Sequence, residues 1–203
     1  MIAFIGDVHR AFDRLAGAVA GLPAGVDVAV QVGDLGLHSD DLGPTGPGVP
    51  PLARIVYYVT GNHDHEPSYR GIAEPTEIAP NLIFVPRGTV LELDGRRIAF
   101  LGGGDSIIDR AVRRDDVDWW PDERVSMADV ARFEGVGRVD FLVCHTPPAF
   151  VYPIFHLRPD PSAVAVERAW EILGRPPVIC GHLHKPRAVG CARVLGELEV
   201  LVA

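Results

Sequence analysis

Apolar runs separated by glycine- and proline-containing turns organise the first sixty residues. Residues 2–5 are apolar without interruption, which is typical of a buried strand. Apolar positions in residues 10–20 recur at helical spacing, and Gly21 with Pro23 ends that pattern. The elements predicted here are a strand at 2–5, a helix at 10–20 and strands at 26–32 and 54–60. This order favours an α/β fold with a sheet buried on both faces.

Shorter elements follow in the rest of the chain. Asp94-Gly95 marks a hairpin turn between two strands. Ser126 with Asp129 three residues later opens one helix, and Asp160-Pro161 caps another. Strands are predicted at 82–85, 89–93, 96–101, 140–144, 178–180, 185–189 and 193–200, and helices at 126–133 and 161–173. The stretches 35–51, 105–125 and 146–159 lack a regular pattern, and long irregular loops are often functional.

Composition places the chain among ordinary globular proteins. It has 203 residues, of which 47% are hydrophobic and 23% charged, so we expect one domain over 1–203. The net charge of -8 argues against a general nucleic-acid-binding face. No apolar run approaches the roughly 20 residues of a membrane span, and residues 1–5 resemble a strand more than a signal peptide. We therefore expect a cytoplasmic protein that does not bind membranes.

The three cysteines argue against a disulfide framework. Cys144, Cys180 and Cys191 cannot all pair, and they lie in apolar, strand-like stretches without the spacing of a zinc site. We expect reduced thiols in the core.

Five short polar groups follow five of the predicted strands. Each stands at the carboxyl end of its strand, where α/β sheets place their ligand sites. Residues two apart in extended chain face the same side, which applies to Asp7 with His9 and to His182 with His184. The groups are Asp7-Val8-His9, Gly33-Asp34, Gly61-Asn62-His63-Asp64, Cys144-His145 and Gly181-His182-Leu183-His184.

The donors in these groups indicate metal binding. They offer two aspartates, one asparagine and four histidines besides the neighbouring His63 and Asp64, which is too many for one ion and suits two. Mixed imidazole and carboxylate donors favour manganese, iron, zinc, cobalt or nickel over calcium or magnesium, and manganese is our first choice. Water between two such ions becomes a strong nucleophile near neutral pH. So many buried polar groups would be costly without ions to pair them.

The order D-x-H, G-D, G-N-H-D, H and G-H-x-H resembles the calcineurin-like metallophosphoesterases. The resemblance runs from Asp7 to His184, and every ligand position is filled. The glycine run 102–104 and the Trp119-Trp120 pair are similar to small members from bacteria and phages. The resemblance implies a four-layer α/β/β/α sandwich with two mixed β-sheets and a dinuclear site on one edge.

The resemblance also implies a role for each residue. One ion would be held by Asp7, His9, Asp34 and His184, and the other by Asp34, Asn62, His145 and His182, with Asp34 as the bridge.

Catalytic and substrate-binding residues are expected outside this metal shell. His63 would protonate the departing alkoxide, while Asp64 would orient its ring and raise its pKa. Arg113 and Arg114 are candidates for contact with the substrate phosphate, because arginine suits bidentate phosphate recognition.

The function implied is hydrolysis of a phosphate ester by a hydroxide that bridges the two ions, with a small phosphodiester or a nucleotide as substrate. A phosphomonoesterase, including a protein phosphatase, is one alternative. A single-strand nuclease is another, although its basic track would be limited to residues 110–114. A non-catalytic metal-binding scaffold is the third, and the complete ligand set argues against it. The sequence leaves the substrate and the oligomeric state open.

Overall fold

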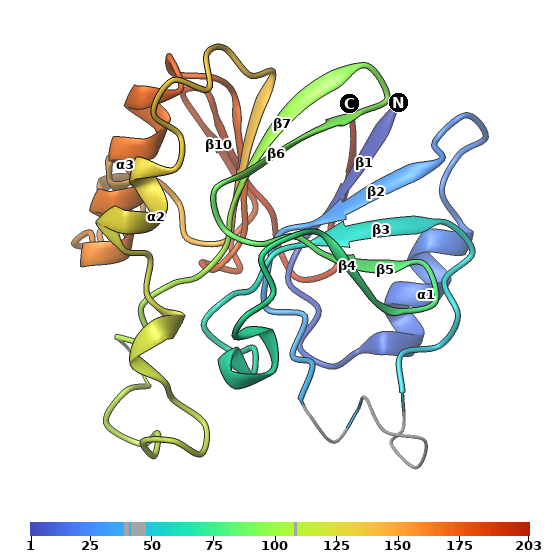
Figure 1. Ribbon diagram of the computed structural model, residues 1–203, viewed down its shortest axis with the longest axis horizontal. Coiled ribbons are helices and arrows are strands. Elements are labelled where there is room, and N and C mark those ends of the chain that lie inside the picture. Colours follow the sequence, from blue (N-terminus) through green and yellow to red (C-terminus); the bar gives the residue numbers. More distant parts are fainter. Residues whose placement is uncertain (39–40, 42–47, 108) are drawn as a thin grey trace.

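Two six-stranded mixed sheets pack face to face, and helices cover their outer faces (Figure 1). The structure is a computed structural model that describes residues 1–38, 41, 48–107 and 109–203. The layers run from helix α1 through the first sheet and the second sheet to helices α2 and α3. The predicted four-layer α/β sandwich is thereby confirmed.

The first sheet has a parallel centre and antiparallel edges. Its strand order is β12-β1-β2-β3-β5-β4. Strands β1 (Ile2–Ile5), β2 (Val28–Gln31), β3 (Ile55–Tyr58) and β5 (Leu82–Phe84) are parallel. The edges are β12 (Val200–Val202) and β4 (Thr76–Ala79). The parallel centre brings the carboxyl ends of β1, β2 and β3 to one edge.

The second sheet repeats this plan in the later part of the chain. Its order is β10-β11-β9-β8-β7-β6. Strands β7 (Arg96–Leu101), β8 (Phe141–Cys144), β9 (Val178–Cys180) and β11 (Ala192–Val194) are parallel. The antiparallel edges are β6 (Thr89–Leu93) and β10 (Arg187–Val189).

Alternating residues of the apolar strands fill separate cores. In β1, Ala3 and Ile5 face the core beneath α1 (Phe12–Ala20), while Ile2 and Phe4 face the core between the sheets. A third core lies between the second sheet and helices α2 (Met127–Ala131) and α3 (Pro161–Ile172). Burial on both faces explains the uninterrupted apolar run, because each large buried side chain stabilises the fold by about 1.5–3 kcal/mol.

The predicted helix caps are present. The Ser126 hydroxyl accepts from the Asp129 backbone amide, and the Asp129 carboxylate accepts from that of Ser126. The Asp160 carboxylate accepts from the Ala163 amide at the start of α3. Among the described residues, the short 3-10 helices η2 (Glu66–Tyr69), η3 (Pro121–Glu123) and η4 (Ala149–Phe155) lie outside the predicted elements.

The predicted strand at 193–200 is wrong. The chain forms β11 in the second sheet, turns through Gly196 and Leu198, and continues as β12 in the first sheet. Leu198 has a left-handed backbone (φ 52°), which ends extended structure. Strand β4 was not predicted because Thr76–Ala79 is polar and half-exposed at a sheet edge.

Three further expectations concern the stretch 35–51, the cysteines and membrane-spanning helices. Within the stretch 35–51, residues 39–40 and 42–47 lie outside the described residues. All three thiols are free, but Cys191 is exposed rather than in the core. Among the helices of the described chain, none is both long and apolar enough to cross a bilayer.

Candidate metal centre

All seven predicted metal ligands lie just beyond strand ends. Asp7 and His9 follow β1, Asp34 follows β2, and Asn62 follows β3. His145 follows β8, and His182 and His184 follow β9. The site therefore joins the edges of both sheets. Its residues are far apart in the sequence, since Asp7 and His182 are separated by 175 positions.

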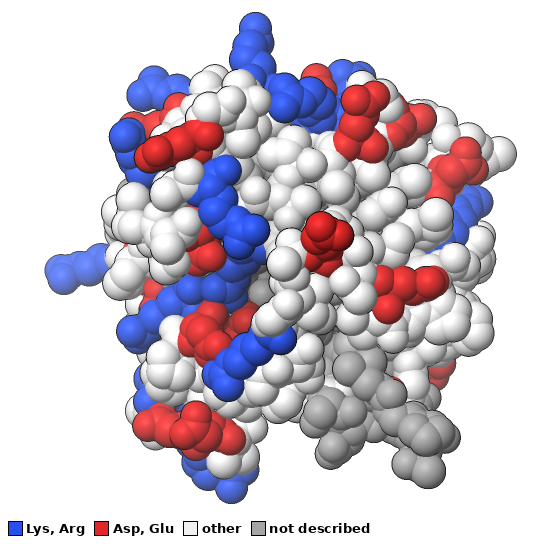
Figure 2. Space-filling view, viewed as in Figure 1, with Lys and Arg blue, Asp and Glu red and all other residues white. Residues whose placement is uncertain are grey.

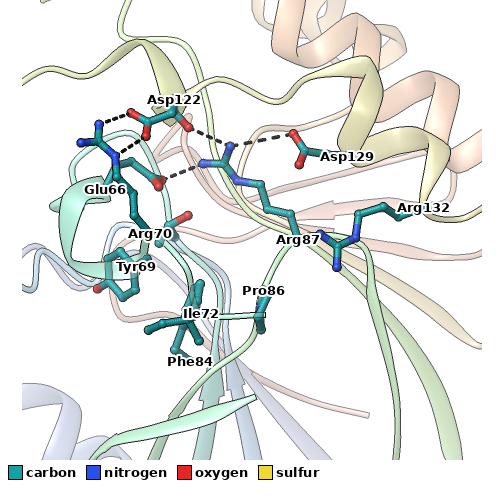
Figure 3. A pocket seen from close by; sticks show the side chains of 11 residues that line it. Glu66, Tyr69, Arg70, Ile72, Phe84, Pro86, Arg87, Asp122, Asp129 and Arg132 are labelled. Atoms are coloured by element: carbon teal, nitrogen blue, oxygen red, sulfur yellow. Dashed lines mark hydrogen bonds and ion pairs between the residues drawn. The ribbon is translucent and has the colours of Figure 1, made fainter. Parts of the chain in front are cut away.

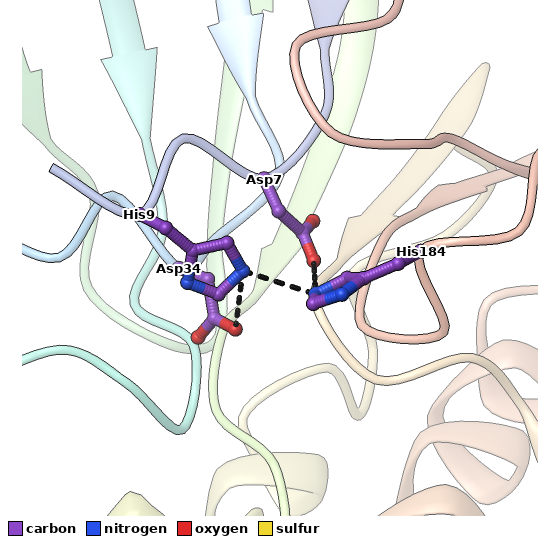
Figure 4. A group of neighbouring side chains, drawn as sticks. All are labelled: Asp7, His9, Asp34 and His184. Atoms are coloured by element: carbon purple, nitrogen blue, oxygen red, sulfur yellow. Dashed lines mark hydrogen bonds and ion pairs between the residues drawn. The ribbon is translucent and has the colours of Figure 1, made fainter. Parts of the chain in front are cut away.

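A first group of donors is partly open to solvent. It consists of Asp7, His9, Asp34 and His184, whose ligand atoms all lie within 4.8 Å of one another (Figure 4). His184 Nε2 lies 3.0 Å from Asp7 Oδ2 and 3.0 Å from His9 Nε2. His9 Nε2 lies 3.7 Å from Asp34 Oδ2. The two aspartates are buried, whereas the His9 and His184 side chains are 29% and 39% exposed.

A second group of donors is deeper. Asn62 Oδ1 lies 2.9 Å from His182 Nδ1 and 3.2 Å from His145 Nε2, and those two ring nitrogens are 3.2 Å apart. The remaining oxygen of Asp34, Oδ1, lies 3.3 Å from His145 Nε2. The two oxygens of one buried carboxylate thus face the two groups.

These spacings fit a bound cation. Around an ion with bonds of about 2.1 Å, neighbouring ligand atoms lie roughly 3.0–3.4 Å apart. The 2.9–3.2 Å spacings of the deeper group fall close to this range. Asp7 Oδ1 is buried without a hydrogen-bond partner in the described chain, and a buried carboxylate oxygen without a partner is costly. A cation held by the Asp7 carboxylate would offset the cost of this burial.

Glycines leave the aspartates and His145 no spare room. A Cβ on Gly181 would lie 1.9 Å from Asp7 Oδ1, and one on Gly61 would lie 2.1 Å from Asp34 Oδ1. A Cβ on Gly33 would meet the His145 ring at 2.6 Å. Only a residue without a side chain allows these approaches, so the glycines of the motifs shape the donor set.

Four of the predicted ligands have unusual backbones. His9, Asp34, His182 and His184 have φ values of 46°, 53°, 68° and 52°, the left-handed region that ordinary residues rarely adopt. Such conformations cost about 1–3 kcal/mol each and cluster at functional sites. Here they turn the chain sharply after a strand and bring the side chain to the sheet edge.

The buried donors Asp34, His145 and His182 shift one another's pKa values. Burial opposes ionisation of Asp34, yet the neighbouring His145 lowers the Asp34 pKa well below its usual value. Burial also opposes protonation of His145, but Asp34 raises its pKa to about 9. Burial and then His145 lower the His182 pKa to about 3. Without a metal, a proton on His145 therefore supplies the positive charge beside Asp34.

The family model for calcineurin-like phosphoesterases matches residues 1–186 of the chain. The chain belongs to this family. Its members act on phosphate esters, so the donors at the strand ends form the candidate metal centre of a phosphoesterase. No curated protein matches the chain.

His63 of this phosphoesterase lies beside the centre without being one of its donors. Arg113 Nη2 donates to His63 Nδ1, and Asp109 Oδ2 lies 3.7 Å from His63 Nε2. The contact with Arg113 assigns the acceptor role to Nδ1, so a neutral ring carries its proton on Nε2. Burial lowers the His63 pKa, Asp34 opposes this and Arg113 adds to it.

The Asp64 carboxylate was expected to orient the His63 ring, but it hydrogen-bonds to backbone amides instead. Its Oδ1 accepts from the amides of Gly36 and Leu37, and its Oδ2 accepts from the amide of Gly61. Burial raises its pKa to about 7. The recorded hydrogen bonds of this carboxylate go to backbone rather than to the His63 ring. Asp64 thus ties the turn that carries Asn62 and His63 to the turn after β2.

The two predicted phosphate-binding arginines differ in position. Arg113 is nearly buried and donates to Asp109, to the Asn62 carbonyl and to Ser106, besides His63. Arg114 is 73% exposed, pairs with Asp118 at 3.7 Å, and is absent from the described residues that line the cleft beside the centre. Asp109 and Glu123, which meet Arg113, were missed because nothing in the local sequence marks them.

A separate small pocket of about 190 Å³ shows how the 105–125 stretch is held (Figure 3). Arg87 pairs with Glu66 at 2.7 Å and donates to the carbonyls of Asp122, Glu123 and Arg124. Arg70 pairs with Asp122 at 2.7 Å. These charges satisfy one another, so the pocket has a structural explanation.

Charged side chains of both signs are interspersed over the face shown in Figure 2.

Proposed function

We propose that this phosphoesterase hydrolyses small phosphodiesters or nucleotides with two divalent transition-metal ions at the strand ends. The observation that carries the proposal is the Asp34 carboxylate, which has Oδ1 3.3 Å from His145 Nε2 and Oδ2 3.7 Å from His9 Nε2. A carboxylate in this position can bridge two ions. The mixture of imidazole and carboxylate donors makes manganese our first choice, with iron, zinc, nickel or cobalt as alternatives.

The donor groups divide between the ions. Asp7, His9 and His184 would hold one ion and Asn62, His145 and His182 the other, with Asp34 shared. Bound ions supply a water nucleophile active near neutral pH and neutralise charge on the phosphate oxygens. His145 Nδ1 lies 3.1 Å from the Val32 carbonyl, a contact that leaves Nε2 free to act as a ligand.

His63 is proposed to stabilise the departing oxygen. Its ring lines the cleft beside the centre, and Arg113 occupies Nδ1, so Nε2 carries the proton that can be donated. The lowered pKa favours a neutral ring as hydrogen-bond donor over the imidazolium acid expected from the sequence. Asp64 acts at one remove, by holding the turn through the Gly36, Leu37 and Gly61 amides.

A diester fits the surroundings better than a monoester. The cleft that includes Asp34, Asn62 and His182 has a volume of about 610 Å³ and continues past the donors to apolar side chains. A monoester brings one organic group to this space, whereas a diester brings two.

The test compares bis-p-nitrophenyl phosphate with p-nitrophenyl phosphate. The chelated protein is supplied with manganese, nickel, zinc or no metal, and metal uptake is followed by calorimetry. We expect turnover that depends on the added metal and is faster with the diester. A faster monoester would identify a phosphatase instead. Metal uptake without turnover of either compound would contradict the proposed activity. The expected cytoplasmic location and single-domain organisation stay predictions.

A further inference from the structure

The cleft beside the metal centre extends well beyond the metal ligands. Its lining includes Asn62, His182 and His184 and also the apolar side chains of Phe155 and Leu183. Its volume of about 610 Å³ is in the range of sites that bind small organic molecules. A phosphate group occupies a small part of such a volume, so the cleft has room for the organic part of an ester.

The part of the lining that η4 and the turn after it contribute, here called the distal end, is mostly apolar and aromatic. Tyr152, Phe155 and Leu157 come from η4 and the turn after it, where His156 has a left-handed backbone (φ 59°). Phe155 and Leu183 also pack against the core of the second sheet, which fixes their position. Apolar side chains cannot hydrogen-bond to a phosphate, but they pack well against a planar ring.

Two cations of the cleft are unpaired. Arg158 and Lys185 are exposed lining residues, and no hydrogen bond or ion pair joins either side chain to another residue in the described ranges. The nearby Arg113 is by contrast saturated by Asp109, Glu123 and Ser106.

The acids of the cleft do not neutralise them. Asp160 accepts from the Tyr152 hydroxyl at 2.7 Å, and Asp105 pairs with Arg124 at 2.6 Å. Asp109 pairs with Arg113 at 2.8 Å. Among the described residues, none of these carboxylates pairs directly with Arg158 or Lys185, so both cations are available to an anionic group.

Resting on the proposed phosphodiesterase function, we propose that the distal end binds the leaving alcohol of a nucleotide-like ester. An aromatic ring packs against Phe155 and Leu183, and a second phosphate pairs with Arg158 and Lys185. The substrate class is a phosphodiester whose leaving nucleoside carries a second phosphate, with the diester cleaved at the metal centre and the second phosphate held by the cations. Exposed cations add modest affinity each, so the pair acts as a selectivity element beside the stronger metal interaction.

The test measures binding instead of turnover. Manganese-loaded protein is titrated calorimetrically with thymidine 3′,5′-bisphosphate and with thymidine 5′-monophosphate, and chromatography checks that the nucleotides stay intact. We expect the bisphosphate to bind about tenfold more tightly, because it alone can reach the cations. The double variant Arg158→Met/Lys185→Met should remove this preference, while Phe155→Ala should weaken binding of both nucleotides.

Arg187→Met is the matched control. Arg187 is exposed on β10 and outside the lining of the cleft, and it also lacks a recorded partner in the described chain, so its loss should leave the preference intact. Equal affinity for the two nucleotides, binding of neither, or a preference that survives in the double variant overturns the subsite. Failure of the proposed function is seen separately, as absent turnover of bis-p-nitrophenyl phosphate while the binding preference persists.

Discussion

The strand ends and the 105–125 stretch meet at the same cleft but are fixed by different means. At the strand ends, the backbone places each ligand within four residues of a hydrogen-bonded strand, and glycines such as Gly61 and Gly181 leave no freedom around the carboxylates. The 105–125 stretch has little regular structure besides η3 and one isolated bridge. Charged side chains hold it, chiefly Arg87 on its carbonyls and Glu123 against Arg113.

Under the proposed function, this difference separates metal binding from leaving-group chemistry. Substitutions that displace the donors at the strand ends should abolish ion binding, since the donors have no alternative position. Substitutions in the 105–125 stretch should move Arg113 and with it the His63 ring, while the donors stay in place. The predictions below test whether the two regions are separable in this way.

The largest effect is expected from Asp34→Asn at the strand ends. Loss of the shared carboxylate charge should lower kcat/KM for bis-p-nitrophenyl phosphate by about a thousandfold or more and weaken metal uptake. Steady-state kinetics and calorimetry with manganese measure both. The control is Asp13→Asn, an exposed position in α1. Near-normal activity of Asp34→Asn would contradict a shared ligand.

A smaller effect is expected from Gly181→Ala. The new Cβ would lie 1.9 Å from Asp7 Oδ1 and must displace that carboxylate, so metal affinity should fall about a hundredfold. Calorimetric titration with manganese measures the change. Gly17→Ala in α1 is the matched control, because a Cβ there meets nothing within 4 Å. Unchanged affinity in Gly181→Ala would show that the glycine is not needed to place the donor.

In the 105–125 stretch, Glu123→Gln should make stability less dependent on pH. Burial raises the pKa of Glu123 from 4.5 to about 7. Between these values the unfolded chain has lost the proton that the folded chain keeps, so wild-type stability falls as pH rises and levels off above pH 7. The stability of Glu123→Gln relative to wild type should rise by about 2 kcal/mol from pH 5 to pH 8.

Urea unfolding of the chelated proteins at several pH values measures this change. Glu134→Gln, at an exposed position, is the control and should follow wild type. A constant difference between Glu123→Gln and wild type across this pH range would show that the buried carboxyl does not titrate as proposed.

The smallest effect is expected from Arg113→Lys. Lysine cannot make the forked contacts of Arg113, so the His63 ring should be less well placed. Turnover of an alkyl ester should fall about tenfold, whereas turnover of a p-nitrophenyl ester, whose leaving group needs little help, should change less. Arg114→Lys is the control because Arg114 is exposed. Equal losses for both esters would indicate a structural role alone.

Local pattern was sufficient for much of the fold. The runs that became β1, β8 and β9 are buried or nearly buried on both faces, so their sequences carry a continuous apolar signal. Edge strands were harder, since β4 is polar and β12 continues from a turn that also ends β11. Which sheet such a strand joins depends on partners far away in the sequence.

By itself the sequence predicted the candidate metal ligands, because each stands just after one of five strands and the parallel strands carry these residues to a shared edge. Only the tertiary structure decided what surrounds that set. The contact of Arg113 with His63 joins residues 50 positions apart, through a stretch held by pairs such as Arg87 with Glu66. Such pairings depend on which residues lie close together in the folded chain, and no periodicity or motif in the sequence indicates this.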